Sequence, residues 1–452
     1  MENYNHKIFS LFAGAGGLDI GLEQAGFNTV LATDIELYSC ETLRHNKILS
    51  TLNQNDINDW FENHVLTQKC YSRAGEAYSI NSLRDRLKQR NGIKYLNNAT
   101  IIQEDIRSLS SEYLAEIAKV KKGELTLIAG GPPCQPFSRS GKRETIEAAD
   151  GRLFLEFVRV VNDLRPRWFL FENVKGLVQS KTVVKYLSCN RCEHIKPVPF
   201  EFNDTIIDFN TLNEKCNKCE SNSISIFEKE IRGGSFDIIV NEFERIGYKC
   251  FYKLLNSADY GVPQSRERLF IVGSRDNENF VWPQNSHSND NHTLTQRSLL
   301  SDLYKIQKWV TVQDVLWQNG HPKFGSINFG LAVLWVKNVV RPHDEPVTWP
   351  LSRVSPTIGA HQGAKLALAP FGVPGEQLLR QQWHVLGKRQ KDLPPVDFPH
   401  AMLSDEELLS LQTFPNWWYL HGTRMQRAFQ IGNAVPPLLA KAVGSAIMAI
   451  SK

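Results

Sequence analysis

Residues 7–25 read KIFSLFAGAGGLDIGLEQA. Residues 7–12 are mostly apolar and predict a buried strand, which a glycine-rich turn and a helix through Ala25 follow. A strand, a glycine turn and a helix form the unit that holds a nucleotide in doubly wound α/β folds. The spacing of Gly14, Gly16 and Gly17 differs from the dinucleotide pattern G-x-G-x-x-G, so this turn alone also fits an ordinary β-to-α connection.

Acidic residues end two further predicted strands. Asp34 follows the run 29–33, and Asp105 follows the run 100–104. A carboxylate about 20 residues after a glycine turn can accept hydrogen bonds from two ribose hydroxyls. Ile35 could then cover an adenine face, and Asp105 could accept from the adenine amino group. Either acid could instead cap a following helix, which is the commoner use of an acid at such a position.

A cysteine follows a further predicted strand, in the sequence Gly131-Pro132-Pro133-Cys134-Gln135. Proline fixes its own φ and pushes the preceding residue toward extended geometry. The turn therefore predicts a thiol held in a defined direction at the sheet edge, as a nucleophile requires. A free cysteine is more often a small buried core residue. Glu172 ends the next apolar run, so we expect its side chain at the same edge as Cys134.

Two arginines at alternate positions, Arg266 and Arg268, precede the apolar run 269–273 and are expected to project from one face of a strand. Alone, such arginines usually indicate a solvated strand face. Here they flank a sheet edge that already holds a thiol, a carboxylate and the glycine turn. Near the C-terminus, the sequence Gly432-Asn433-Ala434-Val435 precedes an alanine-rich helix.

These residues, in this order and spacing from Phe9 to the last helix, resemble the DNA (cytosine-5) methyltransferase family. The resemblance implies an α/β fold with a doubly wound, mostly parallel sheet, the fold of S-adenosylmethionine-dependent methyltransferases. It also implies a smaller DNA-recognition domain. The implied activity is transfer of a methyl group from S-adenosyl-L-methionine to carbon 5 of a flipped cytosine in a specific duplex DNA site, through a covalent cysteine adduct.

The resemblance also implies a role for each matching residue. Cys134 would be the nucleophile and Glu172 the acid at the base. Arg268 would donate to the cytosine carbonyl, and Arg266 would brace the site or a phosphate. The residues that would hold S-adenosylmethionine are Phe12, Gly14, Gly16, Gly17, Asp34, Ile35, Asp105, Ile106, Pro132, Leu153, Asn433 and Ala434. The segment from Ser138 to about Gly151 would form a mobile loop that closes on DNA.

The chain has 452 residues, a length that allows two or three domains. The net charge of +4 is only mildly basic, and residues 284–423 carry 12 Lys and Arg against 11 Asp and Glu. Basic groups that face DNA must therefore cluster in space rather than in sequence. No long apolar span or signal peptide is evident, so we expect a cytoplasmic, nucleoid-associated bacterial protein with no membrane contact. Eight cysteines in that compartment do not imply disulfides.

Two cysteine pairs, Cys189-x-x-Cys192 and Cys216-x-x-Cys219, form a second signal. The two-residue spacing lets both thiolates of a pair bind one tetrahedral ion. The surrounding stretch is polar and would make a poor core without a metal. Four ordinary surface thiols are the alternative, but the paired spacing favours a structural zinc site. The resembled family usually has only a short helical connection here.

We expect a catalytic and cofactor-binding domain over residues 1–275, with insertions at about 47–98 and 180–232, the second being the zinc knuckle. Helical patterns at 57–62 and 82–87 predict a helical first insertion. Residues 276–423 would form the target-recognition domain, and 424–452 would return to the catalytic domain. Asp405-Glu406-Glu407 stands where the family has an arginine–glutamate pair, which leaves the local bracing open.

Two other interpretations of the sequence compete with a DNA-modifying enzyme. Relatives with the same fold that act on tRNA carry a Cys-Phe-Thr motif, which this sequence lacks. A non-catalytic DNA-binding descendant would show decay at Cys134, Glu172 or the glycine turn, and all are intact. We expect a monomer on double-stranded DNA, in a restriction-modification system with a separately acting endonuclease or as an orphan enzyme. The target sequence cannot be read from the chain.

Overall fold

The computed structural model describes residues 6–53, 56–64, 84–88, 90, 94–133, 153–179, 181–198, 215–216, 218–289, 306–316, 329–333, 349–360, 366–370 and 401–451. Cys134, Ser138 and the segment up to Gly151 lie outside these residues, as do parts of both insertions and of the segment 276–423.

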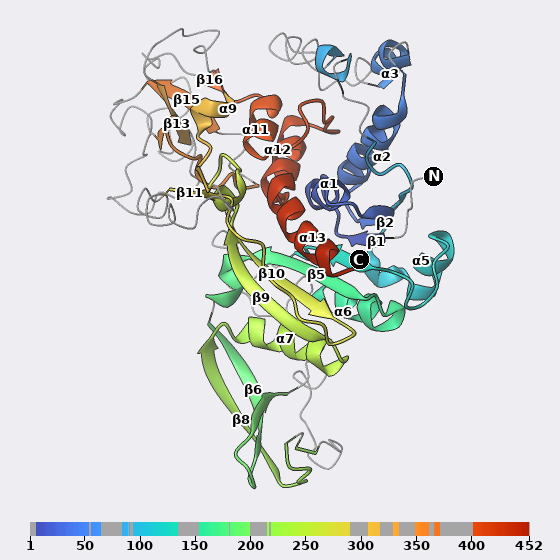
Figure 1. Cartoon of the computed structure of the whole chain (residues 1–452), viewed down its shortest axis with the longest axis vertical. Coiled ribbons are helices and arrows are strands. Elements are labelled where there is room, and N and C mark those ends of the chain that lie inside the picture. Colours follow the sequence, from blue (N-terminus) through green and yellow to red (C-terminus); the bar gives the residue numbers. More distant parts are fainter. Residues whose placement is uncertain are drawn as a thin grey trace, which may run out of the picture.

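A sheet of seven strands in the described part of the chain has the order β3-β2-β1-β4-β5-β10-β9 (Figure 1). Five strands are parallel: β1 (Lys7–Leu11), β2 (Asn28–Asp34), β3 (Thr100–Gln103), β4 (Leu127–Gly130) and β5 (Trp168–Val174). The strand β10 (Glu267–Ser274) is antiparallel to both β5 and β9 (Lys249–Asn256). The predicted doubly wound, mostly parallel sheet is confirmed.

Helices cover both faces of this sheet, which is why its central strands are apolar almost throughout. On one face lie α1 (Gly17–Gln24) and α13 (Pro437–Ser451), whose side chains share a core with Ile8 and Leu127. On the other lie α5 (Ser111–Ile117), α6 (Leu153–Leu164) and α7 (Gly234–Arg245), packed on Phe9 and Phe169. The C-terminal helix thus packs beside the first helix of the chain (Figure 1).

The candidate site residues that the structure describes collect at one edge because of this topology. The chain leaves β1 toward β2 on one side, and β4 lies on the other, and ligands of such sheets bind beyond the carboxyl ends of the strands near this point. The antiparallel direction of β10 places its amino end at the same edge, with Arg268 opposite Val174 of β5. The turns η2 (Ile106–Ser108) and η5 (Lys175–Val178) follow β3 and β5, and η7 (Ser257–Tyr260) follows β9.

The second insertion contains its own three-stranded sheet, built from β6 (Lys181–Cys189), β7 (Ile195–Pro197) and β8 (Ile224–Arg232). In Figure 1 the long hairpin of β6 and β8 extends past α7 and away from the main sheet. Val184 is fully buried and joins the core that contains Ile238 of α7, so the base of the hairpin is anchored to the helical layer on the main sheet.

The first insertion contains helices where the sequence predicts them, at α3 (Asp56–His64) and at residues 84–88, after α2 (Leu37–Thr51). The described parts of the segment 276–423 include the short strands β11 (His287–Ser288), β12 (Gln307–Lys308), β13 (Phe329–Val333), β14 (Trp349–Pro350), β15 (Leu366–Pro370) and β16 (Ala401–Met402) and the helix α9 (Val312–Val315). The helices α11 (Asp405–Leu411) and α12 (Arg424–Asn433) lead to α13.

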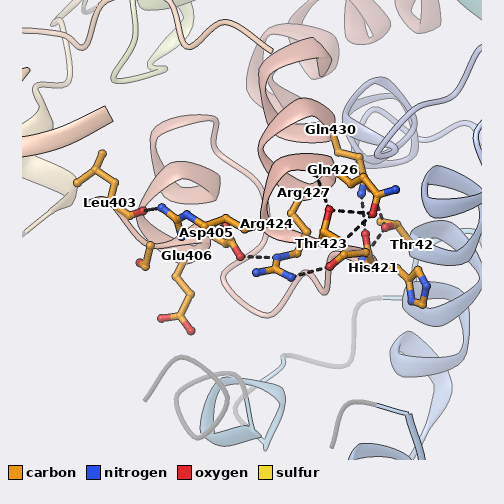
Figure 2. Close-up of polar contacts among 12 residues, drawn as sticks. Thr42, Leu403, Asp405, Glu406, His421, Thr423, Arg424, Gln426, Arg427 and Gln430 are labelled. Carbon is orange, nitrogen blue, oxygen red and sulfur yellow. Dashed lines mark hydrogen bonds and ion pairs between the residues drawn. The ribbon is translucent and has the colours of Figure 1, made fainter. Parts of the chain in front are cut away.

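Bracing at Asp405-Glu406-Glu407 is present, although the residue types differ from those of the resembled family. Ser404 and Glu407 form a capping box at the start of α11. The Asp405 carboxylate accepts a hydrogen bond of 2.6 Å from Arg427 Nε of α12 (Figure 2). Glu406 forms an ion pair with Arg86 of the first insertion. The acidic triplet therefore joins three elements.

The stretch Arg424–Ser451 is long and apolar enough to cross a membrane by length and composition alone. In the structure it consists of two helices, α12 and α13, which residues 434–436 separate. Leu439, Val443 and Ile447 of α13 are fully buried against the main sheet and α1. Packing in the core explains the apolar composition of this stretch.

Candidate active site

The glycine turn between β1 and α1 is held in place by Asp34. Gly14 and Gly16 have φ values of 56° and 82°, in the left-handed region that glycine adopts without strain. One carboxylate oxygen of Asp34 accepts the Gly14 N–H at 2.8 Å, and the other accepts the Glu36 N–H at 2.8 Å. Asp34 therefore braces the turn and the start of α2 together. Burial is the main cause that raises the pKa of the Asp34 carboxyl.

The surroundings of the turn fit a nucleoside. A Cβ built on Gly14 would meet no atom within 4 Å, so the turn opens onto free space there. Ile35 and Leu37, beyond Asp34, expose 56% and 57% of their surface. An open backbone turn, a carboxylate and exposed apolar side chains are the groups that bind a phosphate-free nucleoside such as S-adenosylmethionine.

Other predicted cofactor residues lie in varied surroundings. Asp105 caps η2, and both its carboxylate oxygens accept from Arg107, which lowers the pKa of Asp105. Ile106 is buried in the core between the sheet and α6.

Ala434 lies at the glycine turn, where its Cβ is 3.3 Å from a Cβ built on Gly17, whereas Asn433 beside it is exposed. Phe12 follows β1 with a φ of 56°, Leu153 begins α6, and Pro132 is buried after β4.

An acid–arginine pair occupies the neighbouring strand ends. Glu172 of β5 is 8% exposed, and its Oε1 lies 3.0 Å from Arg268 Nε of β10. The pair is an ion pair without hydrogen-bond alignment, since Glu172 Oε1 has no hydrogen-bond partner among the described residues. Burial raises the pKa of Glu172, and the attraction of Arg268 and Arg266 offsets only part of this effect.

The turn that leads to Cys134 lies against this pair. A Cβ built on Gly131 would lie 2.7 Å from Glu172 Oε2, and Asn173 Nδ2 donates to the Pro132 carbonyl at 3.2 Å. Cys134 itself is outside the described residues. The residues immediately before it adjoin Glu172, as the predicted common edge requires.

Arg266 is 1% exposed and connects distant parts of the chain. Its two terminal nitrogens donate to the carbonyls of Ile358 at 2.9 Å and Gly432 at 2.8 Å. Gln264 Oε1 accepts the Ile358 N–H at 2.8 Å. These contacts hold the segment around Ile358, which lies between β14 and β15, against the start of β10. The family resemblance implied that Arg266 braces the site or a phosphate, and its partners among the described residues are these main-chain carbonyls.

The four cysteines of the second insertion lie together. Their sulfur atoms are all within 4.8 Å of one another, with Cys189–Cys219 at 3.5 Å and Cys192–Cys216 at 3.4 Å. The two pairs form matching turns, since the main-chain N–H that follows each pair donates to the carbonyl of its first cysteine, at 2.9 Å and 2.8 Å. Zn–S bonds of about 2.3 Å place tetrahedral sulfurs about 3.8 Å apart, so these donors suit one zinc ion.

Trp418 also lies at the glycine turn, although the sequence around it gives no sign of this contact. Trp418 donates its indole N–H to the Ala15 carbonyl at 3.1 Å, across 403 residues of sequence. No local pattern connects a tryptophan to a turn so far away along the chain.

The fold is that of an α/β protein whose sheet edge carries a glycine turn held by Asp34 and, beside it, a buried acid–arginine pair. The family model for C-5 cytosine-specific DNA methylases matches residues 6–69, 87–190 and 226–449. The chain therefore belongs to the C-5 cytosine-specific DNA methylase family and is a DNA (cytosine-5) methyltransferase that uses S-adenosylmethionine. The unmatched residues 70–86 and 191–225 fall within the two insertions.

Named relatives support this membership. Type II methyltransferase M.AquIA of Picosynechococcus sp. is 30% identical over 313 residues, which cover 69% of this chain and 87% of the relative. Type II methyltransferase M1.HphI of Haemophilus parahaemolyticus is 26% identical over 97% of this chain and 85% of its own. Crystal structures of a DNMT2 mutant from Spodoptera frugiperda and of Dnmt2 from S. pombe share the fold. Their TM-scores are 0.51 and 0.50, with 14% and 13% identity, over 98% and 99% of this chain and 99% and 100% of theirs.

Proposed function

We propose that the chain methylates a cytosine flipped out of a specific duplex DNA site, through a covalent adduct at Cys134. One observation carries this proposal. The buried Glu172, its partner Arg268 and the turn before Cys134 meet at the sheet edge that also carries the Asp34 turn.

The chemistry needs these groups because carbon 5 of cytosine is a poor nucleophile. Addition of the Cys134 thiolate to carbon 6 makes the ring an enamine, which divides one difficult step into easier ones. Glu172 donates a proton to ring nitrogen 3 and Arg268 donates to the carbonyl oxygen, so both relieve the negative charge of the ring. Burial raises the pKa of Glu172 and so favours the protonated form that this step uses. Carbon 5 would then take the methyl group and lose its own proton to a base. Elimination of Cys134, with return of the nitrogen 3 proton to Glu172, would restore the ring.

S-adenosylmethionine, when bound, supplies an electrophilic methyl group. Asp34 would accept its ribose hydroxyls, Ile35 would cover the adenine, and the turn at Gly14 and Gly16 would allow close approach of the backbone. Asp105 would exchange its contact with Arg107 for the adenine amino group. The remaining predicted cofactor residues would complete the pocket: Phe12, Gly17, Ile106, Pro132, Leu153, Asn433 and Ala434.

Double-stranded DNA is the proposed partner, with the enzyme bound as a monomer. Flipping a base costs a few kcal/mol, which contacts from the segment Ser138–Gly151 and from residues 276–423 would offset. Residues 276–423 would select the target sequence, in a recognition domain beside the catalytic domain 1–275. The names of the bacterial relatives support a modification enzyme, cytoplasmic and nucleoid-associated in a bacterium, which acts separately from any cognate endonuclease.

We also place one structural zinc ion on Cys189, Cys192, Cys216 and Cys219. A four-thiolate site is closed and leaves no position for water or substrate. The ion would therefore fold the hairpin of β6 and β8 without taking part in methyl transfer.

Trapping with 5-fluorocytosine tests the nucleophile. When 5-fluorocytosine replaces every cytosine of a long DNA, the target cytosine is replaced too, whatever the target sequence is. Fluorine at carbon 5 prevents elimination of the enzyme. Wild-type enzyme with S-adenosylmethionine should form an adduct that survives denaturation, and so should the control Cys250→Ser, which alters a cysteine of β9. Cys134→Ser should form none. An adduct that forms with Cys134→Ser at an undiminished rate contradicts the assignment.

A further inference from the structure

The indole ring of Trp418 packs directly against the glycine turn. Trp418 is 2% exposed, and its indole Nε1 donates to the Ala15 carbonyl at 3.1 Å. A Cβ built on Gly16 would lie 3.3 Å from Trp418 Cζ2, so the ring lies directly against the turn. The open side of the turn is at Gly14, where a cofactor would lie. Trp418 therefore contacts the turn without filling that space.

The first insertion packs against Trp418 through its last residues. The ring of Tyr95 meets the Trp418 ring edge-on, with centroids 6.0 Å apart and an interplanar angle of 81°. The Tyr95 hydroxyl accepts from Gln24 of α1 at 2.8 Å, and Ser50 of α2 donates to the Tyr95 carbonyl at 3.1 Å. Ile57, Trp60, Phe61 and Leu87 of the insertion are buried in the same core as Trp418. Tyr95 is thus fixed to the two helices that flank the glycine turn and Asp34.

The residues after Trp418 are joined to α2. The Asn46 side chain donates to the Tyr419 carbonyl at 2.7 Å and accepts the Tyr419 N–H at 2.9 Å. Thr42 accepts the His421 N–H at 2.9 Å and donates to Gln430 of α12 at 2.7 Å (Figure 2). The C-terminal segment that carries Trp418 is therefore held in register with the helix that follows Asp34.

We propose that Trp418 is a cofactor-positioning residue, and that the insertion 47–98 holds it against the glycine turn. The inference rests on the proposed S-adenosylmethionine site at this turn. A glycine-rich turn has much backbone freedom to lose, and a support that fixes it before binding reduces that loss. Trp418 lies near the end of the segment 276–423, six residues before α12. Cofactor binding and docking of this C-terminal segment consequently favour each other, because coupling between binding events is reciprocal.

Two neighbouring tryptophans provide a matched test. Trp418→Phe keeps an aromatic ring and removes the N–H that binds Ala15. Trp417→Phe makes the same change at a residue that is 5% exposed and also packs on Tyr95, at 6.0 Å. Calorimetric titration with S-adenosylmethionine should show a Kd about fivefold to tenfold higher for Trp418→Phe, as expected for loss of one hydrogen bond. Trp417→Phe should stay within about twofold of wild type.

Two further readouts separate positioning from general stability. Hydrogen exchange in the cofactor-free enzyme should become faster over residues 9–20 in Trp418→Phe and not in Trp417→Phe. The kcat at saturating cofactor should be unchanged in both variants, with the effect of Trp418→Phe confined to the KM for S-adenosylmethionine. A Trp418→Phe enzyme with wild-type Kd overturns the inference, and so does an equal rise in Kd for the two variants.

A second variant keeps the inference testable if Trp418→Phe does not fold. Tyr95→Phe retains the ring that faces Trp418 and removes the hydroxyl that Gln24 holds. Its Kd for S-adenosylmethionine should rise about twofold to threefold, and an unchanged Kd contradicts the role of the insertion. If wild-type enzyme itself does not bind S-adenosylmethionine, the proposed function fails instead.

Discussion

Gly131→Ala is expected to displace the Glu172 carboxyl group and reduce activity while leaving the fold intact. The added Cβ would lie 2.7 Å from Glu172 Oε2, and real Cβ atoms essentially never approach closer than 3.0 Å. The carboxylate must therefore move by at least 0.3 Å, the difference of these distances, and by 0.7 Å to reach ordinary contact at 3.4 Å. That movement displaces the carboxylate whose other oxygen lies 3.0 Å from Arg268 Nε.

Gly131→Ala should reduce the activity of the enzyme more than its stability. The side chain of Glu172 can turn, and turning it by about 30° from its preferred rotamer costs about 0.5–1.5 kcal/mol. Such a loss lowers Tm by only about 0.5–1.5 °C in a chain of 452 residues. A misplacement of about 1 Å at a reacting group can reduce the rate about 100-fold. We therefore expect kcat to fall about 10-fold to 100-fold.

The neighbouring glycine is the matched control. A Cβ built on Gly130 would lie 2.3 Å from the Leu11 carbonyl of β1, which is strand backbone rather than a side-chain end. The two strands cannot separate without loss of the sheet, so Gly130→Ala should lower Tm much more than Gly131→Ala. Gly130→Ala should therefore act mainly on stability, and Gly131→Ala mainly on activity.

The assay is transfer of labelled methyl groups from saturating S-adenosylmethionine to plasmid DNA, with calorimetric Tm measured on the same preparations. A Gly131→Ala enzyme with wild-type kcat would refute the placement of Glu172 at the reacting base. The reasoning is equally wrong if Gly131→Ala lowers Tm as much as Gly130→Ala does.

The remaining predictions concern the cofactor, pH, the zinc ion and the target sequence. Asp34→Ala should weaken S-adenosylmethionine binding by about 1.5–3 kcal/mol, and an unchanged dissociation constant in calorimetry would mean that Asp34 serves only as a cap. Burial raises the pKa of Asp19 from 3.8 to about 6, so the folded protein binds this proton more tightly than the unfolded chain does. The resulting stability of about 3 kcal/mol is present below pH 3.8 and is lost as pH rises through about 6. Asp19→Asn should flatten this part of the profile in denaturant titrations, and an unaltered profile would exclude Asp19 as its cause. Elemental analysis should find about one zinc per chain, and disruption of one cysteine pair should expose the hairpin to protease while methyl transfer persists. Metal-free protein with all four thiols open to alkylation would contradict that site. Exchange of residues 276–423 for those of a relative should move the methylated sequence, unless recognition resides elsewhere and the chimera keeps the original site.

Local patterns in the sequence determined most of the sheet and much of the site. Apolar runs of strand length and the glycine turn predict β1, β2, β4, β5 and β10, because burial and backbone conformation at these positions depend on nearby residues. Parallel strands share a carboxyl edge, so Asp34 and Glu172 were expected there. The spacing within each cysteine pair predicts the cluster of four sulfurs, because two intervening residues let both thiolates of a pair bind one tetrahedral ion.

The tertiary structure decided which partners these residues have. The antiparallel direction of β10 brings Arg268 to Glu172, and the buried Arg266 finds carbonyls at Ile358 and Gly432. Trp418 reaches Ala15 only because the C-terminal segment folds back onto α1 and α2. Such contacts join residues far apart along the chain, where packing of the whole core selects the partner and no local pattern records the choice.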